Sequence, residues 1–166
     1  MSYKKFPKEE LIAALREKGL TLSCAESCTG GWFAKCLVDT PGASEVFRGG
    51  VVSYATEVKE DLLGVKKKTV EKNTVYSTAV ASEMAKGVRE LMKTDISVSV
   101  TGVAGPNPQD GKPVGCVCIG VSRKGLTFAE ECQFRGSRTA IRRAAVARMF
   151  EILLQDISET TEKGDN

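Results

Sequence analysis

Apolar residues recur along this chain with two different spacings, and the spacing changes at residues that favour turns. Apolar positions three to four residues apart are typical of amphipathic helices, and Gly or Pro residues mark several of their ends. This pattern predicts helices over Lys8–Lys18, Trp32–Val38 and Glu57–Leu63, a longer helix capped by Ser77, and a last helix that starts near Ser137.

Shorter apolar or alternating segments between these helices have the pattern of β-strands. They predict strands over Leu20–Ala25, Gly49–Tyr54, Asp95–Val100, Val114–Val121 and Leu126–Phe134. Helices alternate with strands over the first two thirds, and a hairpin links the last two strands. This order predicts an α/β fold, a three-layer α/β/α domain with a mixed β-sheet. Ligands in such folds bind where strands pass into helices.

The length of 166 residues suits one domain, with 42% hydrophobic and 27% charged residues. We expect residues 1–157 to form it and residues 158–166 to be a flexible polar tail. No apolar run approaches the roughly 20 residues that span a bilayer, and no apolar signal segment follows Met1. We therefore expect a cytoplasmic protein without contact to a membrane.

The absence of histidine restricts the chemistry most, because histidine is the commonest general base. A nucleophile here must rely on lysine, tyrosine or a carboxylate. The six cysteines form no C-x-x-C pair, so we expect free thiols and neither a metal site nor a cofactor. The net charge of +3 is mild, and no aromatic residues interleave Lys66–Lys68. We expect no nucleic-acid binding and a solvated turn at these lysines.

The loop Ala25–Gly31 joins a predicted strand to a predicted helix. A nucleophilic Ser27 in this loop would lie at the positive end of the helix, where N–H groups of Gly30, Gly31 or their neighbours could stabilise an oxyanion. The alternative is that Ser27 or Thr29 only caps the helix.

Lys59 lies in the first turn of the helix that follows the next strand. The positive end of that helix disfavours a second positive charge, so we expect the pKa of Lys59 to be lowered. A lysine with a lowered pKa can serve as a general base. The alternative is a surface lysine paired with a carboxylate.

Two further loops carry candidate binding residues. The glycines of Thr101–Pro106 can expose backbone N–H groups to a ligand, although the segment also reads as a mobile surface loop. Arg138 and Arg142 lie near the start of the last helix, a position that suits a phosphate. A solvated basic face explains these arginines equally well.

Together these segments resemble the CinA carboxy-terminal domain family, the nicotinamide mononucleotide deamidases of bacterial pyridine-nucleotide recycling. The resemblance runs from about Pro7 to Asp156 and rests on strings that follow in the family's order. They are A-E-S-C-T-G-G at 25–31, G-V-V-S-Y at 50–54 with Lys59 after it, T-G-V-A-G-P at 101–106, K-P-V-G at 112–115 and G-S-R-x-x-x-R-R at 136–143. Because the chain starts at the domain's own first helix, we expect the stand-alone form.

The resemblance implies hydrolysis of nicotinamide mononucleotide to nicotinate mononucleotide and ammonia. Ser27 would be the nucleophile, Lys59 its base, and Tyr54 a polar partner near this dyad. Two rival interpretations stay open. The domain could bind a nucleotide or a partner without turnover, in a competence or damage response. Alternatively, Cys28 could be the nucleophile, since thiols are intrinsically strong nucleophiles.

The resemblance also implies how the substrate is bound. Thr101 and Gly102 would contribute to the pocket, and the nucleotide phosphate would bind to Arg138 or Arg142. The chain departs from the family pattern at Asn107–Gly111, which replaces a loop richer in glycine and threonine, and this change bears on substrate affinity. The sequence leaves open whether the chain forms a homo-oligomer.

Overall fold

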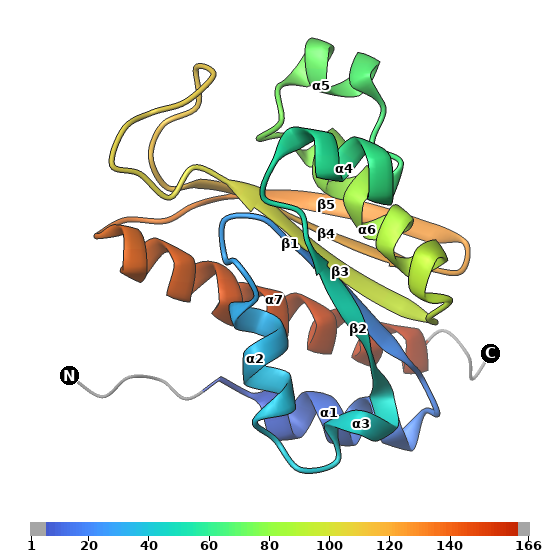
Figure 1. The fold of residues 1–166 in the computed structure, drawn as a ribbon. Coiled ribbons are helices and arrows are strands. Elements are labelled where there is room, and N and C mark those ends of the chain that lie inside the picture. The colour runs from blue at the N-terminus through green and yellow to red at the C-terminus, as the bar shows by residue number, and fades with distance from the viewer. Residues whose placement is uncertain (1–5, 163–166) are drawn as a thin grey trace.

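The protein is a five-stranded sheet between two layers of helices (Figure 1). The computed structural model describes residues 6–162, with side chains up to residue 159. The strand order is β2-β1-β3-β4-β5, in which β1 pairs in parallel with β2 and β3 whereas β4 and β5 are antiparallel. The strands are β1 Leu22–Glu26, β2 Phe47–Val52, β3 Ile96–Gly102, β4 Cys116–Arg123 and β5 Leu126–Gln133. The predicted three-layer α/β/α fold with a mixed sheet is confirmed.

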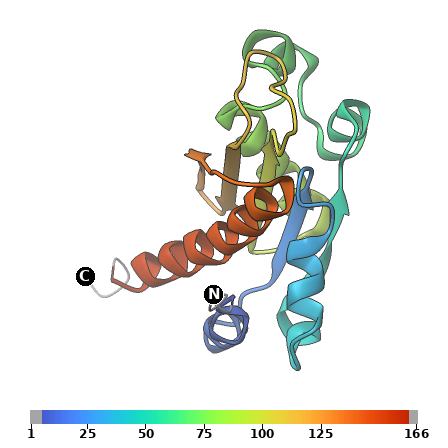
Figure 2. The same cartoon turned by 90° about the vertical axis from the view of Figure 1, so that its left-hand side faces the viewer.

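The two helical layers bury different amounts of apolar surface. One face of the sheet is covered by α1 Lys8–Glu17, α2 Trp32–Val38, α3 Ala43–Val46 and α7 Arg138–Glu162, and the other by α4 Thr56–Leu63, α5 Lys67–Asn73 and α6 Thr78–Met92. The view turned by 90° shows α7 on the opposite side of the sheet from the layer of α4, α5 and α6 (Figure 2). The larger core lies beneath α1, α2 and α7 and includes Phe33 and Phe150, while a smaller core surrounds α6.

Three local predictions differ from the structure. The short helix α3 is additional, and Lys67 and Lys68 belong to α5 rather than to a turn. α5 has no buried residue, so its apolar pattern is too weak to reveal it. Residues 158–162, predicted as a flexible tail, continue α7, and the rest of that segment, 163–166, lies outside the described residues.

Buried hydroxyl groups hold α6 against the sheet. Ser97 and Ser99 of β3 donate to the carbonyl oxygens of Ala85 and Ala81, each at 2.6 Å. The small side chains of this face let the helix approach closely, and a β-carbon on Gly120 of β4 would overlap Ala81 O. The hydroxyls of Ser97 and Ser99 are both hydrogen-bonded, so this polar contact helps to fix the position of the helix without leaving either donor unpaired.

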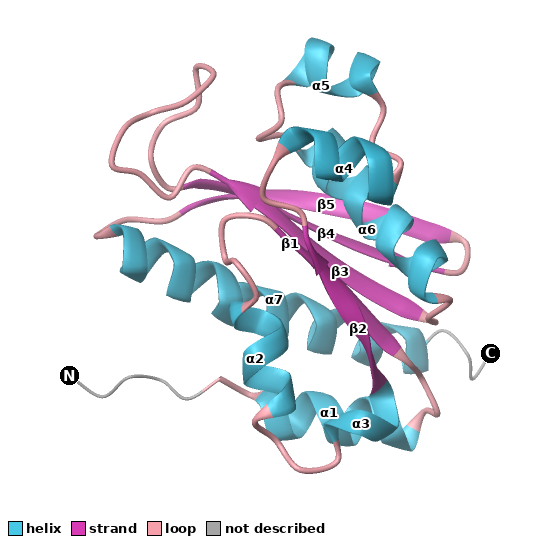
Figure 3. Cartoon of the chain, in the orientation of Figure 1, coloured by secondary structure: helices cyan, strands magenta, loops and turns pink. Residues whose placement is uncertain are grey.

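α4 is held against α6 in a similar way. Gly87 of α6 faces the carbonyl group of Leu63 at the end of α4, and any β-carbon at Gly87 would overlap that oxygen. Because Lys59 belongs to α4, this close contact between α6 and α4 helps to fix the position of the Lys59 backbone relative to the sheet. The loops after β1, β2 and β3 gather at one end of the sheet, next to α4 (Figure 3).

We expect Gly87→Ala to destabilise the protein, although alanine favours a helix interior by about 1 kcal/mol over glycine. The added methyl group has to push Leu63 and α4 away, which costs about 1–3 kcal/mol by overpacking. Urea unfolding measures the change. Lys86→Ala, at an exposed neighbour, is the control and should stay within about 0.5 kcal/mol of the wild type. A stabilised Gly87→Ala variant would contradict the close contact.

Candidate active site

The loops at the end of the sheet enclose a cavity of about 160 Å³. Five residues predicted for the site line it together, namely Ser27, Tyr54, Lys59, Gly102 and Arg138. They come from the segments after β1, β2 and β3 and from the start of α7, so segments far apart in the sequence meet here. The other lining residues are Cys28, Thr56, Val75, Tyr76, Val103, Ala104, Gly105 and Gln109.

The amine of Lys59 is buried at the base of this cavity, with only 2% of the residue exposed. Its Nζ atom lies 3.1 Å from Ser27 Oγ, 2.6 Å from Ser53 O and 3.4 Å from Tyr54 O. A neutral amine has two N–H groups and one lone pair. When the two carbonyl oxygens accept the N–H groups, the lone pair is left for the hydroxyl proton of Ser27.

Burial lowers the pKa of Lys59 to about 8, against weaker opposing effects of Cys28 and Glu57. The predicted direction is confirmed, but its first cause is desolvation and not the helix terminus. The alternative of a surface lysine paired with a carboxylate is wrong, since Lys59 is buried and its Nζ atom contacts a serine hydroxyl and two carbonyl oxygens. With a pKa of about 8, about a fifth of the lysine is neutral at pH 7.4, against about 0.1% for an unperturbed lysine.

The glycines after Ser27 do not provide open N–H groups. Gly30 N donates to Ser27 O at 3.1 Å, and Gly31 N donates to the carboxylate of Glu26 at 3.0 Å. Both glycines have positive φ angles, 62° and 92°, which explains why glycine occupies the turn. Neither lines the cavity. The prediction that Gly30 and Gly31 face an oxyanion is therefore wrong, because the acceptor at this helix start is the protein's own carboxylate.

Thr101 and Arg142 also lie outside the cavity. The Thr101 hydroxyl is fully buried and donates to Val75 O at 3.0 Å. Arg142 donates from Nε to Cys28 O at 2.9 Å and from Nη2 to Thr29 O at 2.8 Å. Both residues hydrogen-bond to backbone carbonyl groups next to the cavity and do not line it. Their predicted contact with the substrate is therefore wrong.

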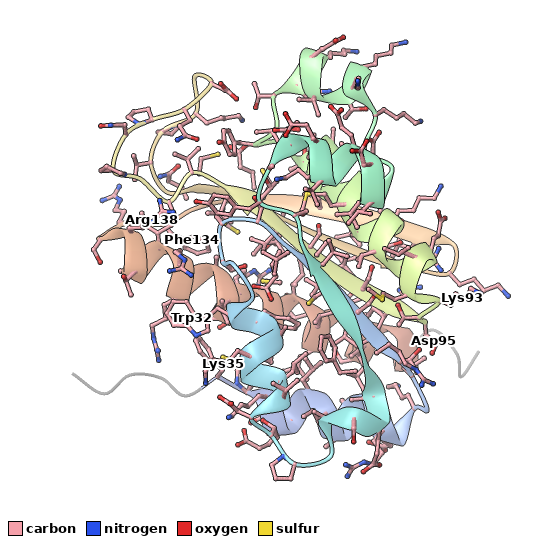
Figure 4. The ribbon with its side chains drawn as sticks, viewed as in Figure 1. Trp32, Lys35, Lys93, Asp95, Phe134 and Arg138 are labelled. Carbon is pink, nitrogen blue, oxygen red and sulfur yellow. The ribbon has the colours of Figure 1, made fainter. Side chains whose placement is uncertain are left out.

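Arg138 lies at the rim of the cavity, below the loop that follows β3 (Figure 4). Its guanidinium donates to Gly105 O at 2.5 Å and to Tyr54 Oη at 3.1 Å. Tyr54 is 64% exposed, so the phenol belongs to the mouth of the cavity rather than to its base. The mouth is therefore cationic and polar, and the base holds the Ser27–Lys59 pair.

Tyr76 and Gln109, which the sequence does not single out, also line the cavity. The Tyr76 hydroxyl donates to Gln109 Oε1, and burial raises the pKa of this tyrosine. Backbone hydrogen bonds in both directions join Gln109 and Lys112 around Asp110 and Gly111, which have φ angles of 48° and 73°. The Asp-Gly pair is a known signal for such a tight turn, so the sequence contains a signal for the ordered turn between Gln109 and Lys112.

Cys28 is the neighbour of Ser27, and it is almost fully buried. Burial, reinforced by Glu26, raises the pKa of its thiol to about 12, against a hydrogen bond from its own backbone N–H group and the charges of Arg142 and Lys59. Since the thiolate is the reactive form of cysteine, this environment disfavours Cys28 as the nucleophile. In the described part of the chain no cluster of three His, Cys, Asp or Glu residues is arranged to hold a metal. None of the described helices is long and apolar enough to cross a membrane.

Comparison with known proteins identifies the domain. The family model of the CinA C-terminal domain matches residues 4–157. This chain belongs to the CinA C-terminal domain family. A competence-damage inducible protein of Bacillus subtilis (strain 168) is 50% identical to it over 147 residues, which are 89% of this chain and 35% of the relative. The chain thus spans about a third of the length of the curated relatives it matches.

Solved structures of CinA proteins have the same fold. A competence or damage-inducible protein from Enterobacter asburiae is 32% identical, with a TM-score of 0.88 over 90% of this chain and 95% of its own. The competence/damage inducible protein CihA from Agrobacterium tumefaciens is 35% identical, with a TM-score of 0.86 over 93% and 98% of the two chains.

The pKa of Lys59 can be measured directly by NMR with ¹³C-labelled lysine. We expect one side-chain signal to titrate near pH 8, because burial disfavours the ammonium form. Absence of this signal from Lys59→Arg assigns it. An assigned Lys59 signal that titrates near 10.4, as for an unperturbed lysine, would show that the amine is solvated and would contradict the site geometry.

Proposed function

We propose that this domain is an amidohydrolase that converts nicotinamide mononucleotide to nicotinate mononucleotide and ammonia. The observation that carries the proposal is the buried hydrogen-bonded pair of Lys59 Nζ and Ser27 Oγ, at 3.1 Å, in the wall of a cavity. A serine next to a base with a lowered pKa is the arrangement that activates a hydroxyl for covalent catalysis. The family resemblance supplies the substrate.

The proposed reaction begins when Ser27 Oγ attacks the carboxamide carbon and its proton passes to Lys59. The tetrahedral intermediate then collapses, the C–N bond breaks, and Lys59 returns the proton to the leaving amine, which departs as ammonia. Water attacks the resulting acyl-enzyme ester with Lys59 again as base, and this step releases the carboxylic acid and regenerates Ser27. The carbonyl oxygens of Ser53 and Tyr54 hold the lysine in place throughout.

Oxyanion donors have to come from a wall other than the start of α2. In the part of the chain that the structure describes, the backbone N–H group of Ala104 donates to no residue, and that of Cys28 bonds only the sulfur of its own side chain. Both residues line the cavity. A buried N–H group without an acceptor, such as that of Ala104, is rare in proteins. We assign these two groups as the donors to the substrate carbonyl oxygen.

The cavity also favours a substrate with a small reactive ring. About 160 Å³ is below the roughly 300–1,000 Å³ typical of sites that enclose a whole ligand. The carboxamide ring would enter the cavity, and the ribose phosphate would lie along the mouth. Arg138 has guanidinium N–H groups beyond the two that bind Gly105 and Tyr54, so it can still bind a phosphate there.

The activity is tested by incubating the purified protein with nicotinamide mononucleotide and a chelator and measuring ammonia. We expect release of ammonia, with a rate that rises with pH up to a plateau above about pH 8, because protonated Lys59 cannot act as base. Ser27→Ala should lower kcat at least about 10³-fold. Lys59→Arg should be nearly as inactive, since arginine keeps its proton.

Cys28→Ser is the matched control for these variants and should retain most of the turnover. Binding of nicotinamide mononucleotide by the wild type without release of ammonia would favour the non-catalytic binding domain instead. An inactive Cys28→Ser variant beside an active Ser27→Ala variant would make the thiol the nucleophile. Substantial turnover by Lys59→Arg would exclude lysine as the base.

Arg138→Ala should raise KM for nicotinamide mononucleotide about tenfold or more and change kcat less, because a phosphate remote from the scissile amide contributes mainly uniform binding. The phosphate-free riboside should be almost indifferent to the substitution. Arg142→Ala is the comparison, since Arg142 does not reach the cavity and should affect both substrates alike. Equal losses for both substrates with Arg138→Ala would place this arginine in a structural role.

A further inference from the structure

The carboxylate of Glu26, the last residue of β1, is buried beside the nucleophile loop with 1% of the residue exposed. Its Oε2 atom accepts from Thr29 Oγ1 at 2.5 Å, Gly31 N at 3.0 Å and Phe33 N at 3.2 Å. Its Oε1 atom accepts from Ala34 N at 2.9 Å. The side chain thus fills the start of α2 and binds the turn that follows Ser27 from within.

The backbone on either side of the Glu26 side chain is fixed as well. Glu26 O accepts from Ser53 N at 2.8 Å, and Ser27 N donates to Val100 O at 3.1 Å. On the outer side of the turn, the guanidinium of Arg142 donates to the carbonyl oxygens of Cys28 and Thr29. A carboxylate that accepts N–H groups and a guanidinium that donates to C=O groups therefore clamp one short turn between them.

This clamp controls a distance that the reaction depends on. Ser27 Oγ is 3.1 Å from Lys59 Nζ, and the two residues belong to different elements, the end of β1 and α4. Within the turn itself, the backbone hydrogen bond from Gly30 N to Ser27 O at 3.1 Å restrains the serine, but the two glycines are conformationally permissive, so contacts from outside the turn also matter. Displacement of a reacting group by about 1 Å can lower a rate by about 10²-fold.

We propose that Glu26 is a positioning residue, whose buried carboxylate holds the turn after β1 so that Ser27 stays within hydrogen-bond distance of Lys59. This inference rests on the proposed Ser27–Lys59 chemistry but not on the identity of the substrate. Glutamine at position 26 keeps the shape of the side chain and one acceptor oxygen. Its NH₂ group, however, faces an N–H donor that now lacks an acceptor, so the turn shifts.

The test compares wild type, Glu26→Gln and Asp95→Asn in the full chain. Asp95 is the control, because its carboxylate accepts from Thr21 N and Thr21 Oγ1 at the far end of the sheet from Arg138 (Figure 4). Two rates are measured well below the unfolding temperature of each variant. One is the turnover of nicotinamide mononucleotide. The other is the rate at which phenylmethanesulfonyl fluoride sulfonylates Ser27. This rate is measured by mass spectrometry of the intact protein, and Ser27→Ala gives the background reaction.

We expect Glu26→Gln to lower kcat and the sulfonylation rate by about tenfold or more with KM nearly unchanged, whereas Asp95→Asn keeps both rates. Wild-type rates in folded Glu26→Gln would overturn the positioning role. If that variant does not fold, Thr29→Val removes a single donor to the carboxylate and should lower both rates by a smaller factor, and wild-type rates there would equally overturn the role.

The two proposals fail in different ways. A wild type that is sulfonylated at Ser27 but releases no ammonia would refute the proposed substrate and leave the positioning role measurable by sulfonylation. A wild type that reacts at Ser27 with neither compound would show that this serine is no nucleophile, and both proposals would fall.

Discussion

The candidate site depends on one buried amine, the Nζ group of Lys59, which the fold holds where an ammonium ion is poorly solvated. Hydrogen bonds to two carbonyl oxygens and a serine hydroxyl offset part of the free energy that burial of this amine costs. α4 has to lie close to β2 for this arrangement, and the glycine contact between α6 and α4 permits it. The same arrangement that disfavours the charge also directs the lone pair to Ser27.

Polar contacts, more than apolar ones, set the geometry around that amine. The hydroxyls of Ser97 and Ser99 hold α6 against β3, and Glu26 and Arg142 hold the turn that carries Ser27. Directional hydrogen bonds define position more sharply than nonspecific apolar burial. Apolar cores lie on both sides of the sheet and stabilise it, and these polar contacts position the elements that line the cavity.

Much of this was predictable from the sequence, and the exceptions have physical reasons. Strand and helix periodicity predicts the layers, and the loops at strand ends make Ser27 and Lys59 candidates, whereas their roles came from the family resemblance. Periodicity cannot show which acceptor takes the N–H groups at the start of α2, because Glu26 reaches them only through the turn between β1 and α2. α5 was missed since nothing in it is buried, and Arg142 was misplaced because its contacts depend on how α7 packs.

The burial of Cys28 has a consequence for how the protein meets oxidants. All six cysteines of the chain have a raised pKa, and burial is the first cause for each of them. Sulfenic acid forms from the thiolate, so thiols that keep their proton at neutral pH react slowly with peroxides. In the proposed mechanism no thiol reacts, and the protonated state of Cys28 makes the proposed activity less sensitive to peroxides than that of an enzyme with a reactive cysteine.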